Sequence, residues 1–176
     1  MRLGLAFIPG MPAGAVVDLV CEAERLGYDD VYLPDQTFHR DPWALLALCA
    51  EATSRVRLGL ALTNPYTRHP IEIARAAGTL ADISDGRFVL GLGAGNRDRV
   101  LAGHGIEQRK VITRMRESIT VIRALLAGET VEHHSETLTV NSVALDFQPP
   151  HPVPIFVGTR GPKMLALAGE LADGVF

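Results

Sequence analysis

The chain has 176 residues, 47% of them hydrophobic, and its formal net charge at pH 7 is −3. This length allows a single domain, residues 1–176, with a sizeable apolar core. The Lys and Arg residues are scattered along a mildly acidic chain, so we expect no nucleic-acid partner and no anionic membrane partner. No apolar run approaches the roughly 20 residues that span a bilayer, and the apolar start is too short for a signal peptide, so we expect a cytoplasmic protein.

Five short, almost continuous apolar runs are spaced along the chain. Such runs are typical of parallel strands that are buried on both faces. The expected strands are residues 3–8, 30–34, 56–62, 87–92 and 154–158.

Amphipathic runs separate these expected strands. The second and third helices are expected to begin at Pro42 and Pro70, because proline favours the first helical position. The fourth covers residues 112–126 and ends before Gly128. The first ends before Gly27, and its expected apolar face is Val16, Leu19, Val20, Ala23 and Leu26.

Residues 130–148 break this alternation and predict a β-hairpin insertion, because they are rich in Thr and Val and lead into a proline-rich segment. A further helix follows the fifth expected strand, and residues 175–176 look like the beginning of a sixth strand. Strand and helix in alternation predict a parallel α/β sheet. Length alone favours an open doubly wound sheet over a (β/α)8 barrel, which needs about 250 residues.

Both architectures place function at the carboxyl ends of the strands. Asp35 follows the second expected strand, where its alternative role is to cap or turn the chain. Thr63 and Asn64 follow the third strand, and they can serve either a ligand or their own loop backbone.

The segment "VLGLGAGN" ends the fourth expected strand with Gly91, Gly93 and Gly95. It lacks the spacing of a dinucleotide fingerprint: no helix is expected for about a dozen residues, and the position about 20 residues after Gly91 is Val111. It also lacks the Lys and Ser/Thr of a P-loop. Glycines at alternate positions instead clear one face of the strand end for a flat ring.

After the fifth strand, Gly158 and Thr159 are expected to present backbone N–H groups near a helix N-terminus. No nucleophile set and no metal cluster converges on these loops: Cys21 and Cys49 read as buried thiols, and the adjacent His133 and His134 as solvated. A bound cofactor is therefore expected to carry the chemistry.

Four segments together carry a family resemblance: "DVYLPDQTFHRDPWALLAL", "RLGLALTNPYTRHP", "ISDGRFVLGLGAGN" and "PIFVGTRGPKMLALAGELADG". The chain resembles the luciferase-like monooxygenase superfamily, in particular its methylenetetrahydromethanopterin reductase-like branch, over essentially its whole length. The resemblance implies a TIM-barrel fold, of which these residues form the first five to six β/α units. It also implies hydride transfer with the deazaflavin coenzyme F-420 (8-hydroxy-5-deazaflavin) or with FMN, a small-molecule substrate and a homodimer.

By position, the resemblance implies catalytic roles for Asp35 and Asn96, and a bulged, non-proline cis peptide near residues 61–63 behind the ring. Asn96 and Ala6 stand where the branch usually carries acidic residues, and an amide cannot exchange a proton as a carboxylate does. The cofactor-binding residues implied are Asp35, Ala61, Leu62, Thr63, Asn64, Gly93, Gly95, Gly158 and Thr159.

The chain is short for this family. We expect the N-terminal half of a longer enzyme; two associating chains, or a unit closed in another way, are the alternatives. A half barrel leaves unpaired edge strands, which favour association. The alternative function is therefore a non-catalytic half barrel with a structural or associative role.

Overall fold

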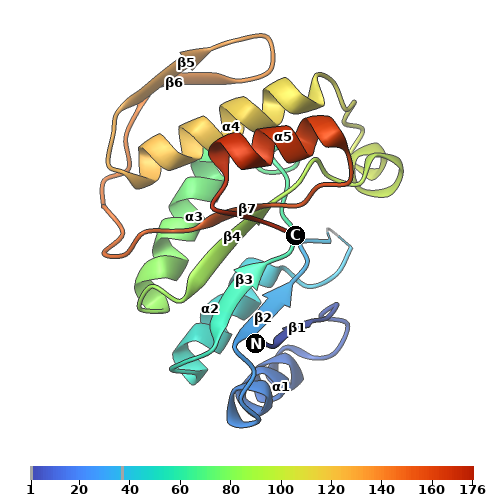
Figure 1. Cartoon of the computed structure of the whole chain (residues 1–176), viewed down its shortest axis with the longest axis vertical. Helices are drawn as coiled ribbons and strands as arrows, with labels where there is room; N and C mark the ends of the chain where they lie inside the picture. Colours follow the sequence, from blue (N-terminus) through green and yellow to red (C-terminus); the bar gives the residue numbers. More distant parts are fainter. Residues whose placement is uncertain (1, 37) are drawn as a thin grey trace.

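The computed structural model describes residues 2–36 and 38–176. Its centre is a six-stranded parallel sheet in which each strand lies beside the preceding one, with the hairpin strands set apart (Figure 1). The sheet strands, in spatial order, are β1 (Gly4–Ala6), β2 (Asp30–Leu33), β3 (Arg57–Leu60), β4 (Phe88–Leu92), β7 (Ile155–Val157) and β8 (Gly174–Val175).

This strand order has no reversal, whereas a doubly wound sheet has a switch point at which the order reverses. The open-sheet alternative is therefore wrong, and the order is that of one side of a barrel. The helices between the strands are α1 (Ala13–Arg25), α2 (Pro42–Ala52), α3 (Pro70–Ile83), α4 (Val111–Leu126) and α5 (Pro162–Leu171).

The helix boundaries follow local signals. Pro42 and Pro70 open α2 and α3 as expected, and Asp41 caps α2 by accepting hydrogen bonds from two backbone N–H groups. Gly27 follows α1 with a φ of +84°, a left-handed conformation that glycine adopts without strain. The expectation for Leu26 is wrong: it lies beyond the last turn of α1 and is 61% exposed.

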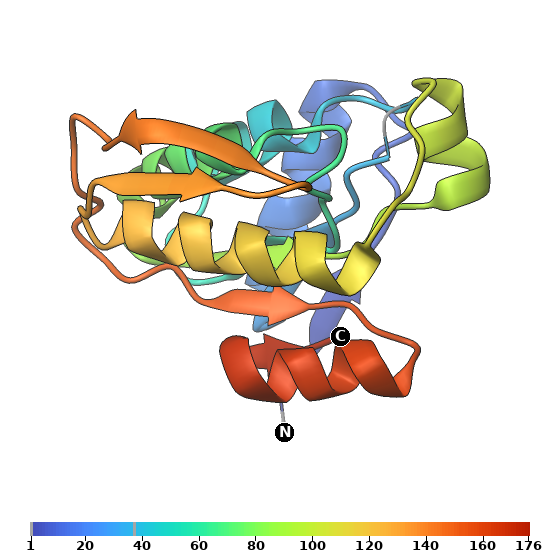
Figure 2. The same ribbon diagram turned by 90° about the horizontal axis from the view of Figure 1, so that it is seen from above.

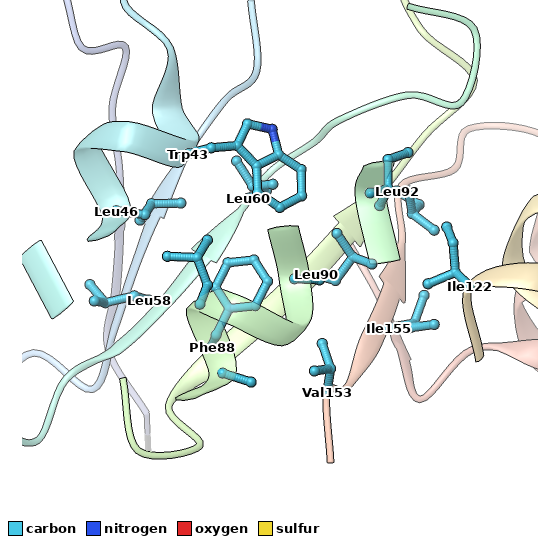
Figure 3. Close-up of a cluster of buried hydrophobic side chains, with 14 of the residues drawn as sticks. Trp43, Leu46, Leu58, Leu60, Phe88, Leu90, Leu92, Ile122, Val153 and Ile155 are labelled. Atoms are coloured by element: carbon cyan, nitrogen blue, oxygen red, sulfur yellow. The ribbon is translucent and has the colours of Figure 1, made fainter. Parts of the chain in front are cut away.

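The main core lies between the sheet and the helices, because alternate residues of a strand face the same side. Trp43 from α2 packs against Phe88 of β4, with ring centroids 6.1 Å apart. Figure 3 shows the cluster around these rings. Its labelled members are Trp43, Leu46, Leu58, Leu60, Phe88, Leu90, Leu92, Ile122, Val153 and Ile155.

The opposite face of the sheet is less covered. Tyr32 and Phe156 lie there beside Phe176, whose ring centroid is 5.0 Å from that of Tyr32 and 5.5 Å from that of Phe156. Burial on both faces is confirmed for β4 but wrong for β1, where Gly4 and Ala6 are exposed. The reason is that β1 is an outer strand with β2 as its neighbour on one side only.

The predicted hairpin is confirmed as β5 (Val131–His134) and β6 (Thr139–Val143). Figure 2 shows α4 between this hairpin and β7. Met115, Ile119 and Ile122 of α4 are buried, and two charged residues of the helix face the hairpin: Arg114 donates to the carbonyl of Thr137, and Glu117 accepts from Ser135 and Thr137. The hairpin covers this side of the helix, so these charged groups hold it in place.

Cys49 is fully buried and Cys21 is half-buried, so the prediction of two buried thiols holds for Cys49 only. Burial, with a smaller contribution from Cys21, raises the pKa of the Cys49 thiol to about 12. Both cysteines are free. Cys49 therefore stays protonated at neutral pH.

His134 is exposed as predicted, whereas His133 is half-buried with its Nε2 atom 3.6 Å from a Glu117 oxygen. Across residues 2–36 and 38–176, no group of three or more His, Cys, Asp or Glu side chains is placed to hold a metal ion. The helices of the same residues are all too short or too polar to cross a membrane.

Candidate functional site

Every predicted site residue lines one cavity of about 670 Å³ at the carboxyl ends of β2, β3, β4 and β7. The predicted residues on its wall are Asp35, Ala61, Leu62, Thr63, Asn64, Gly93, Gly95, Asn96, Gly158 and Thr159. Cavities for small molecules and cofactors commonly have about 300–1,000 Å³. The geometry brings these residues together, and their binding roles stay predictions.

Asp35 is held by two neighbours. Its Oδ2 atom accepts a hydrogen bond from Thr63 Oγ1 at 2.7 Å and a longer one from Trp43 Nε1 at 3.4 Å. Thr63 follows β3 and Trp43 lies in the first turn of α2, so two segments orient one carboxylate. Both bonds use the same oxygen, which leaves Oδ1 for a ligand.

The end of β3 has an irregular backbone. The peptide bond between Ala61 and Leu62 is cis, as the family resemblance implied. Directly after it, the Thr63 N–H donates to the Gly91 carbonyl at 3.0 Å, and the Gly93 N–H donates to the Thr63 carbonyl at 2.9 Å. The backbone therefore rejoins β4 past the cis bond, and the peptide of Ala61–Leu62 lies on the cavity wall.

The space left by the glycines is taken by the side chain of Leu62. A Cβ atom placed on Gly93 would lie 2.8 Å from Leu62 Cδ1, and one placed on Gly158 would overlap that same atom. On Gly91 it would meet the Leu60 carbonyl as well. The prediction that the glycines leave their peptide planes open to a flat ring is thus corrected at Gly91 and Gly93, over which the Leu62 side chain lies.

Asn64 is buried and satisfies its own loop. Its Oδ1 atom accepts from the backbone N–H groups of Tyr66 at 3.1 Å and Thr67 at 3.0 Å. Gly95, with a φ of +79°, passes close to it, since a Cβ there would lie 3.2 Å from Asn64 Cγ. The oxygen therefore has a structural role, and only the NH2 group of Asn64 is left for a ligand.

Asn96 caps a short helix that the sequence analysis missed. Its Oδ1 atom accepts from the Arg99 N–H at 3.0 Å, at the start of the π-helical turn η1 (Arg97–Leu101). The expectation that no helix begins for about a dozen residues is wrong, because an Asn cap starts this turn directly after the glycines. The Asn96 oxygen therefore has a structural role.

Gly158 and Thr159 differ in what their backbones offer. The Gly158 N–H donates to the Leu92 carbonyl at 2.8 Å and continues the sheet, so the expectation that it is free for a ligand is wrong. The Thr159 hydroxyl donates to the Gly161 carbonyl at 3.2 Å. In the described part of the chain, the Thr159 N–H has no acceptor and remains the donor at this edge of the cavity.

The cavity wall also contains residues outside the predicted set. Gln36 lies next to Asp35, Met164 comes from α5, and Arg99 and Arg160 are exposed at the rim. The position of Gln36 beside a strand-end carboxylate could have indicated it, and both arginines stand shortly after predicted site residues in the sequence. Met164 gave no such signal, because it reaches the cavity from a helix.

The charge of the cavity is unbalanced. Among the described lining residues, Asp35 is the single carboxylate, whereas Arg99 and Arg160 add positive charge at the rim. A proton that is taken up or released inside the cavity therefore has one carboxylate to go to. Ala6 ends β1 and is not one of the described lining residues.

A parallel sheet wound in one direction, with a cofactor-sized cavity at the carboxyl ends of its strands, defines a partial β/α barrel of the cofactor-binding kind. The chain belongs to the luciferase-like monooxygenase family, whose model matches residues 4–176.

Comparison with known proteins agrees with the fold and the branch. The chain is 39% identical to the 5,10-methylenetetrahydromethanopterin reductase of Archaeoglobus fulgidus over 99% of this chain and 52% of that protein. It is 34% identical to the F420-dependent glucose-6-phosphate dehydrogenase of Nakamurella multipartita, over 90% of this chain and 50% of that protein.

Among solved structures, the coenzyme F420 dependent tetrahydromethanopterin reductase from Methanopyrus kandleri superposes with a TM-score of 0.88 at 28% identity, covering 99% of this chain and 55% of that one. The predicted barrel fold is therefore confirmed. The chain spans about half the length of the relatives it matches.

Proposed function

We propose that these residues form the ring-binding half of an oxidoreductase that transfers a hydride between the deazaflavin coenzyme F-420 and a small-molecule substrate, with FMN as the alternative coenzyme. Relatives at 39% and 34% identity are a reductase and an F420-dependent dehydrogenase. The single observation that carries the proposal is the common cavity of all predicted site residues. The chain covers about half of each relative, so the main claim of the proposal is that these residues bind the coenzyme, and catalytic turnover is its second claim.

The residues present fit a flat ring with one polar edge. Leu62 supplies an apolar wall, and the glycines behind it let this wall sit deep in the strand ends. The Thr159 N–H and the Asn64 amide group are donors for the carbonyl oxygens at a ring edge. When bound, the coenzyme supplies the hydride chemistry.

Asp35 would serve the substrate side. Two hydrogen bonds fix its Oδ2 atom, so its Oδ1 atom can accept a hydrogen bond from a substrate hydroxyl or hold a proton there. Asn96 cannot exchange a proton and is used as a helix cap, which leaves Asp35 as the candidate proton-holding group. The catalytic role of Asn96 stays a prediction, and it would rest on the NH2 group of this side chain.

Coenzyme binding tests this proposal. Purified chain is titrated with the deazaflavin coenzyme and, separately, with FMN, and coenzyme fluorescence is recorded. We expect saturable quenching by the native chain and at least about tenfold weaker binding by Leu62→Glu, because burying a carboxylate against an apolar ring is costly. Leu165→Glu is the matched control, since Leu165 is 54% exposed on α5. Failure of both coenzymes to bind, or equal weakening by the two variants, would contradict the proposal.

The second candidate is a non-catalytic half barrel that associates through its open side. The outer strands β1 and β8 each have one neighbour, and Ile8 and Phe176 are 48% and 43% exposed. Sedimentation distinguishes the candidates: association without coenzyme binding supports this one, and a monomer that binds coenzyme rejects it. The dimer and the cytoplasmic location remain predictions.

A further inference from the structure

A second, smaller cavity adjoins the proposed coenzyme cavity. It has a volume of about 200 Å³, and Asp35 and Gln36 belong to the walls of both cavities. A molecule in the small cavity would therefore reach the same carboxylate as one in the large cavity. Its lining residues are Asp35, Gln36, His39, Asp41, Pro42, Thr67, Arg68 and His104.

Arg68 is the distinctive group of this small cavity. Its guanidinium carbon lies 4.5 Å from the centre of the Trp43 ring, so the indole holds one face of a half-buried cation. Exposed arginines such as Arg97 and Arg109 pair with carboxylates, whereas Arg68 has no carboxylate within 4.0 Å in residues 2–36 and 38–176. Its N–H groups also donate to no carbonyl or hydroxyl among these residues, so they are available to a ligand.

The two carboxylates of this wall are already engaged. Asp41 Oδ1 accepts from the backbone N–H groups of Trp43 and Ala44 at 2.9 and 3.1 Å, at the N-terminus of α2. Asp35 accepts from Trp43 and Thr63 through one oxygen. Both negative charges are thus partly compensated by protein donors, and the guanidinium of Arg68 is not.

Two imidazoles complete the wall. His104 Nδ1 lies 2.7 Å from the Val100 carbonyl oxygen. Because a carbonyl oxygen can only accept a hydrogen bond, Nδ1 carries the hydrogen, and Nε2 remains for a ligand. His39 also faces the cavity. The wall thus combines one fixed cation with two groups that donate when protonated.

We propose that the small cavity is an oxyanion subsite, in which Arg68 binds a carboxylate or phosphate group of the substrate. A planar guanidinium pairs with either group through two parallel N–H···O bonds, and the stacked indole fixes the plane of that fork. As a statement about the substrate, this rests on the proposed function: the reacting end would lie at Asp35 and the anionic end at Arg68. The proposed substrate class is a small organic anion.

Trp43 is the only tryptophan of the chain and stacks on Arg68, so its emission is a direct reporter of the subsite. The native chain is titrated with acetate and with inorganic phosphate, with chloride at matched ionic strength as the reference. We expect a saturable change in emission with at least one oxyanion and none with chloride. Arg68→Gln should bind about tenfold more weakly, because it loses the charge-assisted hydrogen bonds.

Arg75→Gln is the matched control, because Arg75 is exposed on α3 and paired with Glu72. Since Arg68→Gln also alters the surroundings of Trp43, titration calorimetry gives a second measure of affinity. A chain that responds to neither oxyanion, or an Arg68→Gln variant of native affinity, would overturn the subsite.

These titrations contain no coenzyme, so the two proposals can fail separately. Oxyanion binding in a chain that binds neither coenzyme would keep the subsite and reject the proposed function. Coenzyme binding without an oxyanion response would reject the subsite and keep the proposed function.

Discussion

Two half-buried arginines at opposite ends of the sheet have opposite surroundings. Arg87, at the amino end of β4, donates to the carbonyls of Ala50, Thr53 and Val56 and to the Thr53 hydroxyl, at 2.9–3.0 Å. Arg68, at the carboxyl end, stacks on an indole and faces a cavity. In a β/α barrel the residues at the amino ends of the strands contribute to stability, and those at the carboxyl ends bind ligands. Arg87 and Arg68 follow this rule.

The largest expected effect comes from removing the satisfied arginine. Arg87→Ala leaves the carbonyls of Ala50, Thr53 and Val56 without this donor, and we expect a loss of about 3 kcal/mol of unfolding free energy. Urea unfolding followed by circular dichroism measures it. Arg68→Ala, the matched variant, should lose only about 1 kcal/mol, since it removes one partly solvated cation–π contact. Equal losses of unfolding free energy for the two variants would contradict this difference between Arg87 and Arg68.

Glu24 gives the second largest effect, again away from the cavity. Its carboxylate accepts from the backbone N–H groups of Ser54, Arg55 and Val56 at 2.7–3.2 Å, and so ties α1 to the start of β3. We expect Glu24→Ala to cost about 2 kcal/mol at pH 7, because it removes the acceptor of all these donors. Glu22→Ala, which removes an exposed pair with Arg25, should leave the stability almost unchanged.

The contribution of Glu24 to the free energy of unfolding decreases as the pH falls. Burial raises the pKa of this carboxyl, but the hydrogen bonds from the Val56, Arg55 and Ser54 amides outweigh it and hold the pKa below its ordinary value of 4.5. The stabilisation is therefore fully present above about pH 4.5 and is lost as the pH falls through the folded-state pKa. The difference between native and Glu24→Ala chains should narrow between pH 6 and pH 3, and a constant difference would contradict this assignment.

The order of elements and the location of the site could be predicted because their signals are local. Pro42 and Pro70 set helix starts by their own φ angles, and the residues after parallel strands converge whatever their side chains are. The partner of each polar group could not be predicted. That the Gly158 N–H belongs to the sheet and that Asn96 caps a helical turn depend on strand register and turn geometry, which one sequence does not encode locally.

The same limit explains the misreading of the glycines. Their spacing correctly indicated that something lies close to the strand ends, but the sequence does not say that Leu62, about thirty residues earlier than Gly91, is what lies there. The stack of Arg68 on Trp43 could not be predicted for a similar reason, since Arg68 lies in the loop before α3 and Trp43 lies in the first turn of α2.

The smallest expected effect tests this correction at the binding end. Gly158→Ala places a methyl group on Leu62, with Cγ and Cδ2 also 3.1 and 3.2 Å away, so Leu62 must turn into the cavity. We expect a loss of about 1 kcal/mol, because the neighbour is one flexible side chain and not backbone. Gly161→Ala, in the same loop, meets nothing within 4 Å and should be nearly neutral.

A double-mutant cycle separates the two explanations of Gly158. If the glycine makes room for Leu62, then Gly158→Ala should be harmless in a Leu62→Ala background, and the coupling free energy in urea unfolding should be about 1 kcal/mol. If the glycine instead serves a ligand directly, the two stability effects add and the coupling is near zero. Because the cycle is measured without coenzyme, an additive result would show that the unliganded strand ends do not need Leu62 over the glycines, and the cavity wall proposed for the ring would then have to be redrawn.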